Sequence, residues 1–167
     1  MSQVRFAENH DIPALVELGR QIHAQSRYAW MPFSAKRLWS ALEAAIPNKQ
    51  HCLIVAMESS SRNDKNGPSD VDEAALMGVL WAYVQALPFC NEFVAQIDTL
   101  YVLPKHRGSP VAMKMMTGLR RWANNRQVAE ILIPNAFGLD QVYSAKLLGK
   151  LGLKPVGGVH SMWVERQ

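Results

Sequence analysis

Residues 99–112, TLYVLPKHRGSPVA, predict an apolar strand that ends in a short basic turn and leads directly into a helix. The first N–H groups of a helix have no intrahelical acceptor and lie at the positive end of its dipole, so an anion is stabilised there. Arg107 adds a planar cation, and Gly108 lets the backbone approach a ligand. Ser109 and Pro110 fit the N-cap and first helical positions. The segment therefore predicts either a phosphate-binding turn or a well-capped strand-to-helix connection.

Apolar residues recur along the chain with alternating strand and helix spacing, which predicts one α/β domain over residues 1–167. The length and a hydrophobic content of 49% suffice for one core. Residues 58–75 are polar and charged and predict a flexible surface loop within this domain. Strands are predicted at 4–7, 52–57, 76–84, 93–102, 129–133 and 159–164, and helices after the caps Asp11 and Ser34 and over 111–125 and 139–150.

The net charge of +4 suits an acidic ligand or loose binding to nucleic acid. The basic residues are spread over several segments without a dense tract, which argues against a dedicated nucleic-acid-binding protein. Cys52 and Cys90 lack metal-ligand spacing and predict reduced thiols and no metal site. No apolar run reaches the roughly eighteen residues of a membrane span, and residues 1–5 lack the apolar core of a signal peptide. We therefore expect a soluble, cytoplasmic protein without a membrane partner.

Two motifs resemble those of the GCN5-related N-acetyltransferase (GNAT) superfamily. Its motif A reads Leu-x-Val-x-Pro, two further residues, and Arg-Gly-x-Gly-x-Gly/Ala, and here Pro110 replaces the middle glycine and offers no N–H. Residues 144–153 resemble the family's Ala-x-x-Leu-Tyr-x-Lys-x-Gly-Phe, but Leu148 replaces the tyrosine that protonates the leaving thiolate, and Gln141 replaces a common asparagine. The matching residues are Leu100, Val102, Pro104, Arg107, Gly108, Ala112, Lys150, Gly152 and the apolar Leu153.

The resemblance implies a mixed, mostly antiparallel twisted sheet that is splayed between its fourth and fifth strands and flanked by about four helices. It also implies acetyl-coenzyme A (acetyl-CoA) as co-substrate and direct attack of a primary amine on the thioester. The thioester carbonyl would be polarised by a backbone N–H near residues 100–102. The residues implied in coenzyme A binding are Leu100, Tyr101, Val102, Arg107, Gly108, Ser109, Val111 and Ala112. Self-association into a homodimer stays open.

An attacking ammonium must first lose a proton, and Asp98 is the best carboxylate candidate for this base. Strand alternation places Gln96, Asp98 and Leu100 on one face unless a bulge intervenes. Asp98 could equally hydrogen-bond a neighbouring loop, and the amide of Gln96 stands where a base would suit but cannot take a proton. His160, on the predicted last strand, fits either a structural or a proton-transfer role. Helical geometry turns Tyr143 away from the position of a substitute acid.

Three functions remain open from the sequence. The first is an acetyl-CoA-dependent N-acetyltransferase, and the second is an acyl-CoA-binding or interaction module in which Pro110 and Leu148 have weakened or abolished catalysis. The third is a basic protein whose main partner is nucleic acid or another protein. The aromatic stretch 26–33 either packs over a core edge or lines a binding groove. The acceptor amine is not predicted, because variable loops determine its identity.

Overall fold

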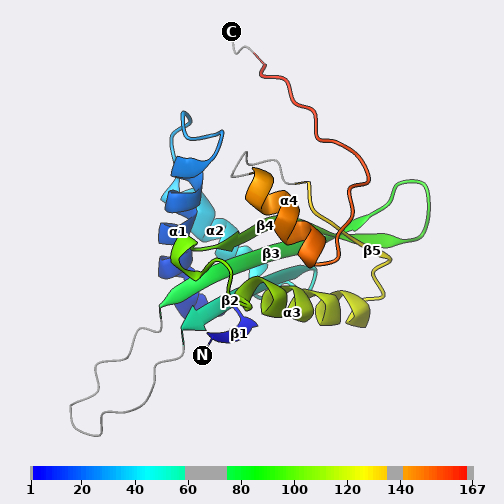
Figure 1. Cartoon of the computed structure of the whole chain (residues 1–167), viewed down its shortest axis with the longest axis horizontal. Coiled ribbons are helices and arrows are strands. Elements are labelled where there is room, and N and C mark those ends of the chain that lie inside the picture. Colours follow the sequence, from blue (N-terminus) through cyan, green and yellow to red (C-terminus); the bar gives the residue numbers. More distant parts are fainter. Residues whose placement is uncertain (1, 59–74, 135–140, 165–167) are drawn as a thin grey trace, which may run out of the picture.

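The protein has an α/β architecture built on one five-stranded sheet, seen in a computed structural model that describes residues 2–58, 75–134 and 141–164 (Figure 1). The strands follow the chain order β1-β2-β3-β4-β5, and each neighbouring pair is antiparallel except β4 and β5, which are parallel. This confirms the predicted mixed, mostly antiparallel sheet. The strands are β1 Ser2–Phe6, β2 His51–Glu58, β3 Leu76–Ala86, β4 Phe93–Val102 and β5 Glu130–Leu132.

Four α-helices flank the sheet, as predicted, with α1 and α2 on one face and α3 on the other (Figure 1). The strongly periodic segments were predicted to the residue, since β4 and α3 have the expected bounds. The helices are α1 Ile12–Gln25, α2 Ala35–Ala45, α3 Val111–Asn125 and α4 Gln141–Lys150, with short 3-10 turns at Asn9–Asp11 and Pro104–His106. Within the described residues, none of the helices is both long and apolar enough to cross a bilayer.

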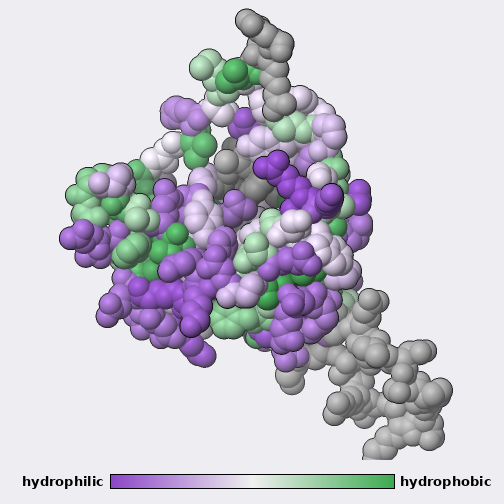
Figure 2. Space-filling view, turned by 180° about the vertical axis from the view of Figure 1, so that it is seen from behind, coloured by the Kyte–Doolittle hydropathy of each residue, from purple (hydrophilic) through white to green (hydrophobic). Residues whose placement is uncertain are grey.

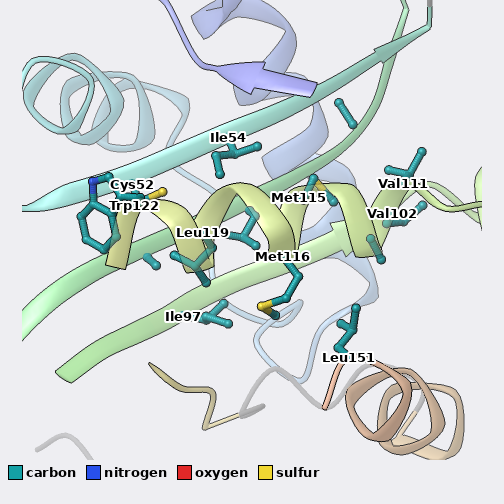
Figure 3. Close-up of a cluster of buried hydrophobic side chains, with 14 of the residues drawn as sticks. Cys52, Ile54, Ile97, Val102, Val111, Met115, Met116, Leu119, Trp122 and Leu151 are labelled. Carbon is teal, nitrogen blue, oxygen red and sulfur yellow. The ribbon is translucent and has the colours of Figure 1, made fainter. Parts of the chain in front are cut away.

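Helix α3 packs directly onto the sheet and forms what we call the α3-face core (Figure 3). Met115 and Leu119 are completely buried between α3 and the strands. Gly78 of β3 permits this contact, because a Cβ there would lie 2.7 Å from the carbonyl oxygen of Tyr101 and 3.3 Å from Met115 Cε. The larger buried members of this core are Cys52, Ile54, Leu80, Ile97, Val102, Val111, Met116, Trp122 and Leu151.

The opposite face of the sheet is covered by α1 and α2, which together with it form the α1/α2-face core. Ser34 caps α2 as predicted, since its hydroxyl accepts the Arg37 N–H at 3.2 Å. Asp11 does not cap α1 with its side chain. Its buried carboxylate instead accepts hydrogen bonds from Arg5 at 2.7 and 2.8 Å and from the Glu8 N–H at 2.8 Å. The start of α1 is thereby tied to β1.

A β-bulge in β4 changes which side chains share a face of the sheet. The register passes from Trp81↔Thr99 to Ala82↔Ile97, so Asp98 has no partner on β3. Leu100 consequently packs against the α3-face core, whereas Thr99 faces α1 and α2. The stated exception of a bulge therefore applies, and Leu100 does not share a face with Asp98, because the extra residue reverses the alternation after Ile97.

Strands β4 and β5 pair only through Val94–Gln96 and Glu130–Leu132, so β4 has no β5 partner beyond Gln96. This parting confirms the splayed sheet. The predicted strand over residues 159–164 is wrong, because residues 153–164 form neither helix nor strand and extend away from the sheet (Figure 1). Gly157 and Gly158 weaken strand formation there, and β5 offers only three residues to pair with. The predicted surface loop lies almost entirely in residues 59–74, outside the described residues.

Candidate active site

The turn between β4 and α3 presents free helical N–H groups, as the sequence predicts. The first backbone hydrogen bond of α3 runs from Lys114 N to Pro110 O at 2.9 Å. The N–H groups of Val111, Ala112 and Met113 precede this bond and therefore have no acceptor within the helix. Three donors at the positive end of a 15-residue helix make an anion site chemically reasonable.

The cap of α3 differs from the prediction by one residue. Pro110 occupies the N-cap, and Ser109 lies before it without capping the helix. The Ser109 hydroxyl donates instead to the carbonyl oxygen of His106 at 2.6 Å, which tightens the turn. Pro110 therefore removes one donor just outside the helix, while the three N–H groups of the first turn remain.

Gly108 has a backbone conformation that favours glycine, with φ of +82°. Among the described residues, apart from its two chain neighbours, no atom lies within 4 Å of the position that a Cβ would occupy, so the space beside the turn is open. The glycine is required by its dihedral angles, and it leaves the backbone accessible to a ligand.

Arg107 braces the turn against both β4 and α4. Its Nε donates to the carbonyl oxygen of Val102 at 3.3 Å, and its guanidinium carbon lies 5.8 Å from the Tyr101 ring centre and 5.0 Å from that of Tyr143. Tyr143 faces away from the Leu148 position, as helical geometry predicts, and this orientation brings its ring to Arg107. A cation–π contact between distant segments has no signature in one sequence.

The open edge of β4 carries backbone groups that point into the gap between β4 and β5. Leu103 N donates to Met77 O at 2.9 Å, which makes these residues a hydrogen-bonded antiparallel pair. Such pairs alternate with non-hydrogen-bonded pairs, and the register places Gly78↔Val102 and Leu80↔Leu100 in the second class. The N–H and C=O groups of Leu100 and Val102 therefore point away from β3. Arg107 reaches the Val102 carbonyl oxygen from that side.

A pocket of about 490 Å³ lies between the sheet and helices α1 and α2, and we call it the α1–α2 pocket. Asp98 and Thr99 line it from β4, and the Thr99 hydroxyl donates to Asp98 Oδ2 at 3.1 Å. Tyr28 and Phe33, from the aromatic stretch between the helices, also line it. Phe33 additionally packs against the α1/α2-face core, so this stretch both packs on the core and lines a groove. Outside the pocket, this side of the molecule is mostly hydrophilic, with hydrophobic residues at the tip of the β3–β4 hairpin and on the C-terminal segment (Figure 2).

The remaining predicted site residues lie elsewhere. Gln96 donates to the Tyr83 hydroxyl at 2.7 Å and, with the half-buried Leu148, lines a second cavity of about 1280 Å³ beside β5 and the C-terminal segment. His160 is exposed on that segment and is not on a strand. Burial raises the pKa of the Cys52 thiol to about 12 despite the nearby Arg126 charge, so it is a poor nucleophile near neutral pH. Among the described residues, no three His, Cys, Asp or Glu side chains come together as a metal site would require.

No protein-family model and no curated protein matches the sequence. Solved structures do match: AAC(6')-Iy in complex with the bisubstrate analog CoA-S-monomethyl-acetylneamine aligns with a TM-score of 0.73 and 16% identity over 100% of this chain and 99% of its own. Glucosamine-6-phosphate N-acetyltransferase from Arabidopsis thaliana aligns with a TM-score of 0.73 and 12% identity over 99% of each chain. The chain has the GNAT acetyltransferase fold.

Within the GNAT fold, the β4–α3 turn and the parted strands are the features that the sequence resemblance implied. A predicted acetyltransferase with acetyl-CoA from Clostridium acetobutylicum aligns with a TM-score of 0.66 and 18% identity over 100% of this chain and 96% of its own. At these identities the likeness is one of fold. Function has to be argued from the site.

Proposed function

We propose that this protein is an acetyl-CoA-dependent N-acetyltransferase that acts on a primary amine. The observation that carries the proposal is the gap where β4 parts from β5, with open N–H groups at the start of α3 on one side and a carboxylate-bearing pocket on the other. The AAC(6')-Iy structure holds a coenzyme A conjugate and the Clostridium structure holds acetyl-CoA, which supports acetyl-CoA as co-substrate.

We expect the coenzyme A pyrophosphate to bind at residues 107–112. The N–H groups of Val111 and Ala112 supply hydrogen bonds, Gly108 leaves space for the phosphates, and Arg107 supplies positive charge. The pantetheine arm then extends along β4, where Leu100 and Val102 present backbone groups to the gap. The side chain of Tyr101 lies on the α1/α2 face, and its N–H and C=O groups point toward β3, so Tyr101 lies beside the arm without offering it a polar group.

The reaction needs one base and one oxyanion donor. Asp98 accepts a proton from the substrate ammonium, directly or through a water, and the free amine attacks the thioester carbon to form the N–C bond. The backbone N–H of Leu100 or Val102 stabilises the oxyanion of the tetrahedral intermediate. The nitrogen then loses its second proton to solvent, and the C–S bond breaks to give the neutral amide and the coenzyme A thiolate. Leu148 has no proton to donate, so solvent protonates the thiolate.

Two other candidates for the base are weaker on geometry. Gln96 is hydrogen-bonded to Tyr83 and has no basic atom of useful strength. His160 is exposed on an irregular segment and does not line the α1–α2 pocket. Asp98 does line that pocket, and it lies two residues from the Leu100 N–H.

One alternative function retains support from the site. An acyl-CoA-binding module with weak catalysis would explain why Pro110 offers no donor and Leu148 no acid. No feature of the described residues favours nucleic acid as the main partner. A cytoplasmic location and a homodimer remain predictions.

Two measurements on the purified protein test this proposal. Acetyl-CoA should raise the melting temperature, because a ligand that binds only the folded state stabilises it. Coenzyme A thiol should then be released when amines are added. Thermal stabilisation without thiol release for any amine would favour the binding module, and no stabilisation at all would contradict both functions.

A further inference from the structure

The α1–α2 pocket is open to the surface and reaches into the α1/α2-face core. Leu18, Leu53 and Val79 line it, and each is at least 92% buried. Its volume of about 490 Å³ falls in the range of small-molecule sites. A pocket of this size and lining takes an apolar body of small-molecule dimensions.

Charge in the pocket is sparse. Asp98 is the only acidic residue among the described residues that line it. Arg37 and His23 are the other residues of the lining that can carry a charge. Arg37 is exposed, and the centre of the His23 ring lies 5.5 Å from that of the Phe33 ring. A polycationic acceptor would need several carboxylates, and a phosphorylated acceptor would need clustered cations. Neither set is present in this lining.

The carboxylate lies beside the part of β4 whose N–H groups point into the gap. The bulge leaves Asp98 without a β3 partner, and the Thr99 hydroxyl holds its Oδ2 at 3.1 Å. Leu100, whose N–H points into the gap, follows two residues after Asp98. Trp81, across from Thr99, is itself held by a hydrogen bond from its Nε1 to His51 Nδ1 at 3.1 Å.

Aromatic side chains gather around Tyr28, at one part of the pocket lining. Tyr28 lines the pocket, and its ring lies 6.0 Å from that of Trp163 in an edge-on arrangement. Arg27 donates to the Ser161 hydroxyl at 2.8 Å and lies over the Trp163 ring at 5.0 Å. The C-terminal segment thus contacts the stretch that joins α1 and α2 beside the pocket-lining Tyr28.

We infer that the acceptor is a small primary monoamine on an apolar body, aromatic or branched aliphatic, which enters the α1–α2 pocket with its amino group at Asp98. This inference rests on the proposed acetyltransferase function and names its substrate class. The apolar body lies against Leu18 and Phe33, and the ammonium forms a charge-assisted hydrogen bond with the carboxylate.

The test measures thiol release from acetyl-CoA with four amines: 2-phenylethylamine, 1,4-diaminobutane, kanamycin and glucosamine 6-phosphate. We expect kcat/KM for 2-phenylethylamine to exceed the values for the other three by at least tenfold. Ala41 of α2 lines the pocket, whereas Ala44 on the same helix does not, and both are exposed. Ala41→Phe should raise the KM for 2-phenylethylamine at least tenfold with acetyl-CoA affinity unchanged, and Ala44→Phe should change neither value.

The outcomes separate this inference from the proposed function. Faster turnover of any of the three polar amines, or an unchanged KM in Ala41→Phe, would overturn the substrate class while leaving the acetyltransferase function in place. Absence of acetyl-CoA binding would overturn the proposed function itself. Binding of acetyl-CoA with no turnover of any of the four amines would count against both.

Discussion

The two faces of the sheet carry similar apolar residues but are packed differently. On the α3 face, Gly78 lets the helix settle directly on the strands, and Met115 and Leu119 are fully buried (Figure 3). On the other face, α1 and α2 leave a pocket of about 490 Å³ bounded by buried residues such as Leu18. The α3 face is closely packed around Met115 and Leu119, and the second cavity on that side lies beside Met116, β5 and the C-terminal segment. The pocket inside the other core indicates that the α1/α2 face is shaped to admit a ligand.

Identical substitutions on the two faces should have unequal effects on stability. Leu119→Ala should lower the free energy of unfolding by about 3–5 kcal/mol, because it leaves a cavity in a filled core. Leu18→Ala should cost about 1–2 kcal/mol less than that, because the pocket already deprives this side chain of partner atoms on one side. Urea unfolding of both variants measures the difference. Equal losses of unfolding free energy would contradict the difference in packing between the two faces.

Catalysis should depend on Asp98, which lines the α1–α2 pocket. Asp98→Asn should lower kcat on the order of a hundredfold, since the amide cannot accept the proton. Acetyl-CoA affinity and the melting temperature should stay close to the wild-type values, because the side chain is exposed. Steady-state kinetics beside His160→Ala provide the comparison. A fully active Asp98→Asn together with an inactive, folded His160→Ala would move the base to His160.

The stability that comes from the Arg5–Asp11 ion pair, which ties the start of α1 to β1, should depend on pH. Burial alone would raise the pKa of Asp11, but the hydrogen bonds from Arg5 and the Glu8 N–H outweigh it, and the folded-state pKa is lowered. The resulting stability is therefore present above the unfolded pKa of about 3.9 and is lost as the pH falls through the folded value. Asp11→Asn should cost about 2 kcal/mol at pH 7.

That cost should shrink when unfolding is measured below about pH 4. Glu17→Gln is the matched control, because Glu17 is exposed and pairs with Arg20 only on the helix surface. We expect no measurable change for this control at either pH. A cost for Asp11→Asn that is the same at pH 3 and pH 7 would contradict the ion-pair account.

The smallest effect is expected at the cap of α3. Pro110→Gly restores one N–H beside the β4–α3 turn but loosens the start of the helix. The free energy of acetyl-CoA binding should therefore become more favourable by about 1 kcal/mol at most. Calorimetric titration of the variant measures the change. A clear loss of affinity would mean that the proline shapes the turn in a way that matters more than the missing donor.

Local patterns predicted the elements well, and pairing between distant segments explains what they missed. The apolar period over 93–102 and 111–125 predicts β4 and α3 because their buried faces follow strand and helix spacing. The bulge at Asp98 depends on the register with β3, and the contact of Arg107 with Tyr143 depends on where α4 lies. Residues 159–164 alternate like a strand, but in the described structure they lack a neighbouring strand to pair with.

The candidate site was predictable in part for the same reason. The turn at residues 107–112 is a local feature, so its N–H groups could be foreseen, although its cap shifted by one residue. The α1–α2 pocket depends on how two helices sit on a sheet. Only the aromatic stretch between those helices hinted at it.

The central claim, that acetyl-CoA binds at the β4–α3 turn, is tested most directly by calorimetric titration of acetyl-CoA into the wild type and Arg107→Glu. We predict saturable binding to the wild type that is weakened by about 2–3 kcal/mol in Arg107→Glu, a loss of roughly 30- to 150-fold, because the substitution places a negative charge beside the phosphates. Arg121→Glu, the same charge reversal on an exposed part of α3, should bind like the wild type, with melting temperatures recorded for all three proteins. Wild-type affinity in a folded Arg107→Glu variant, or equal losses in both variants, would contradict the claim.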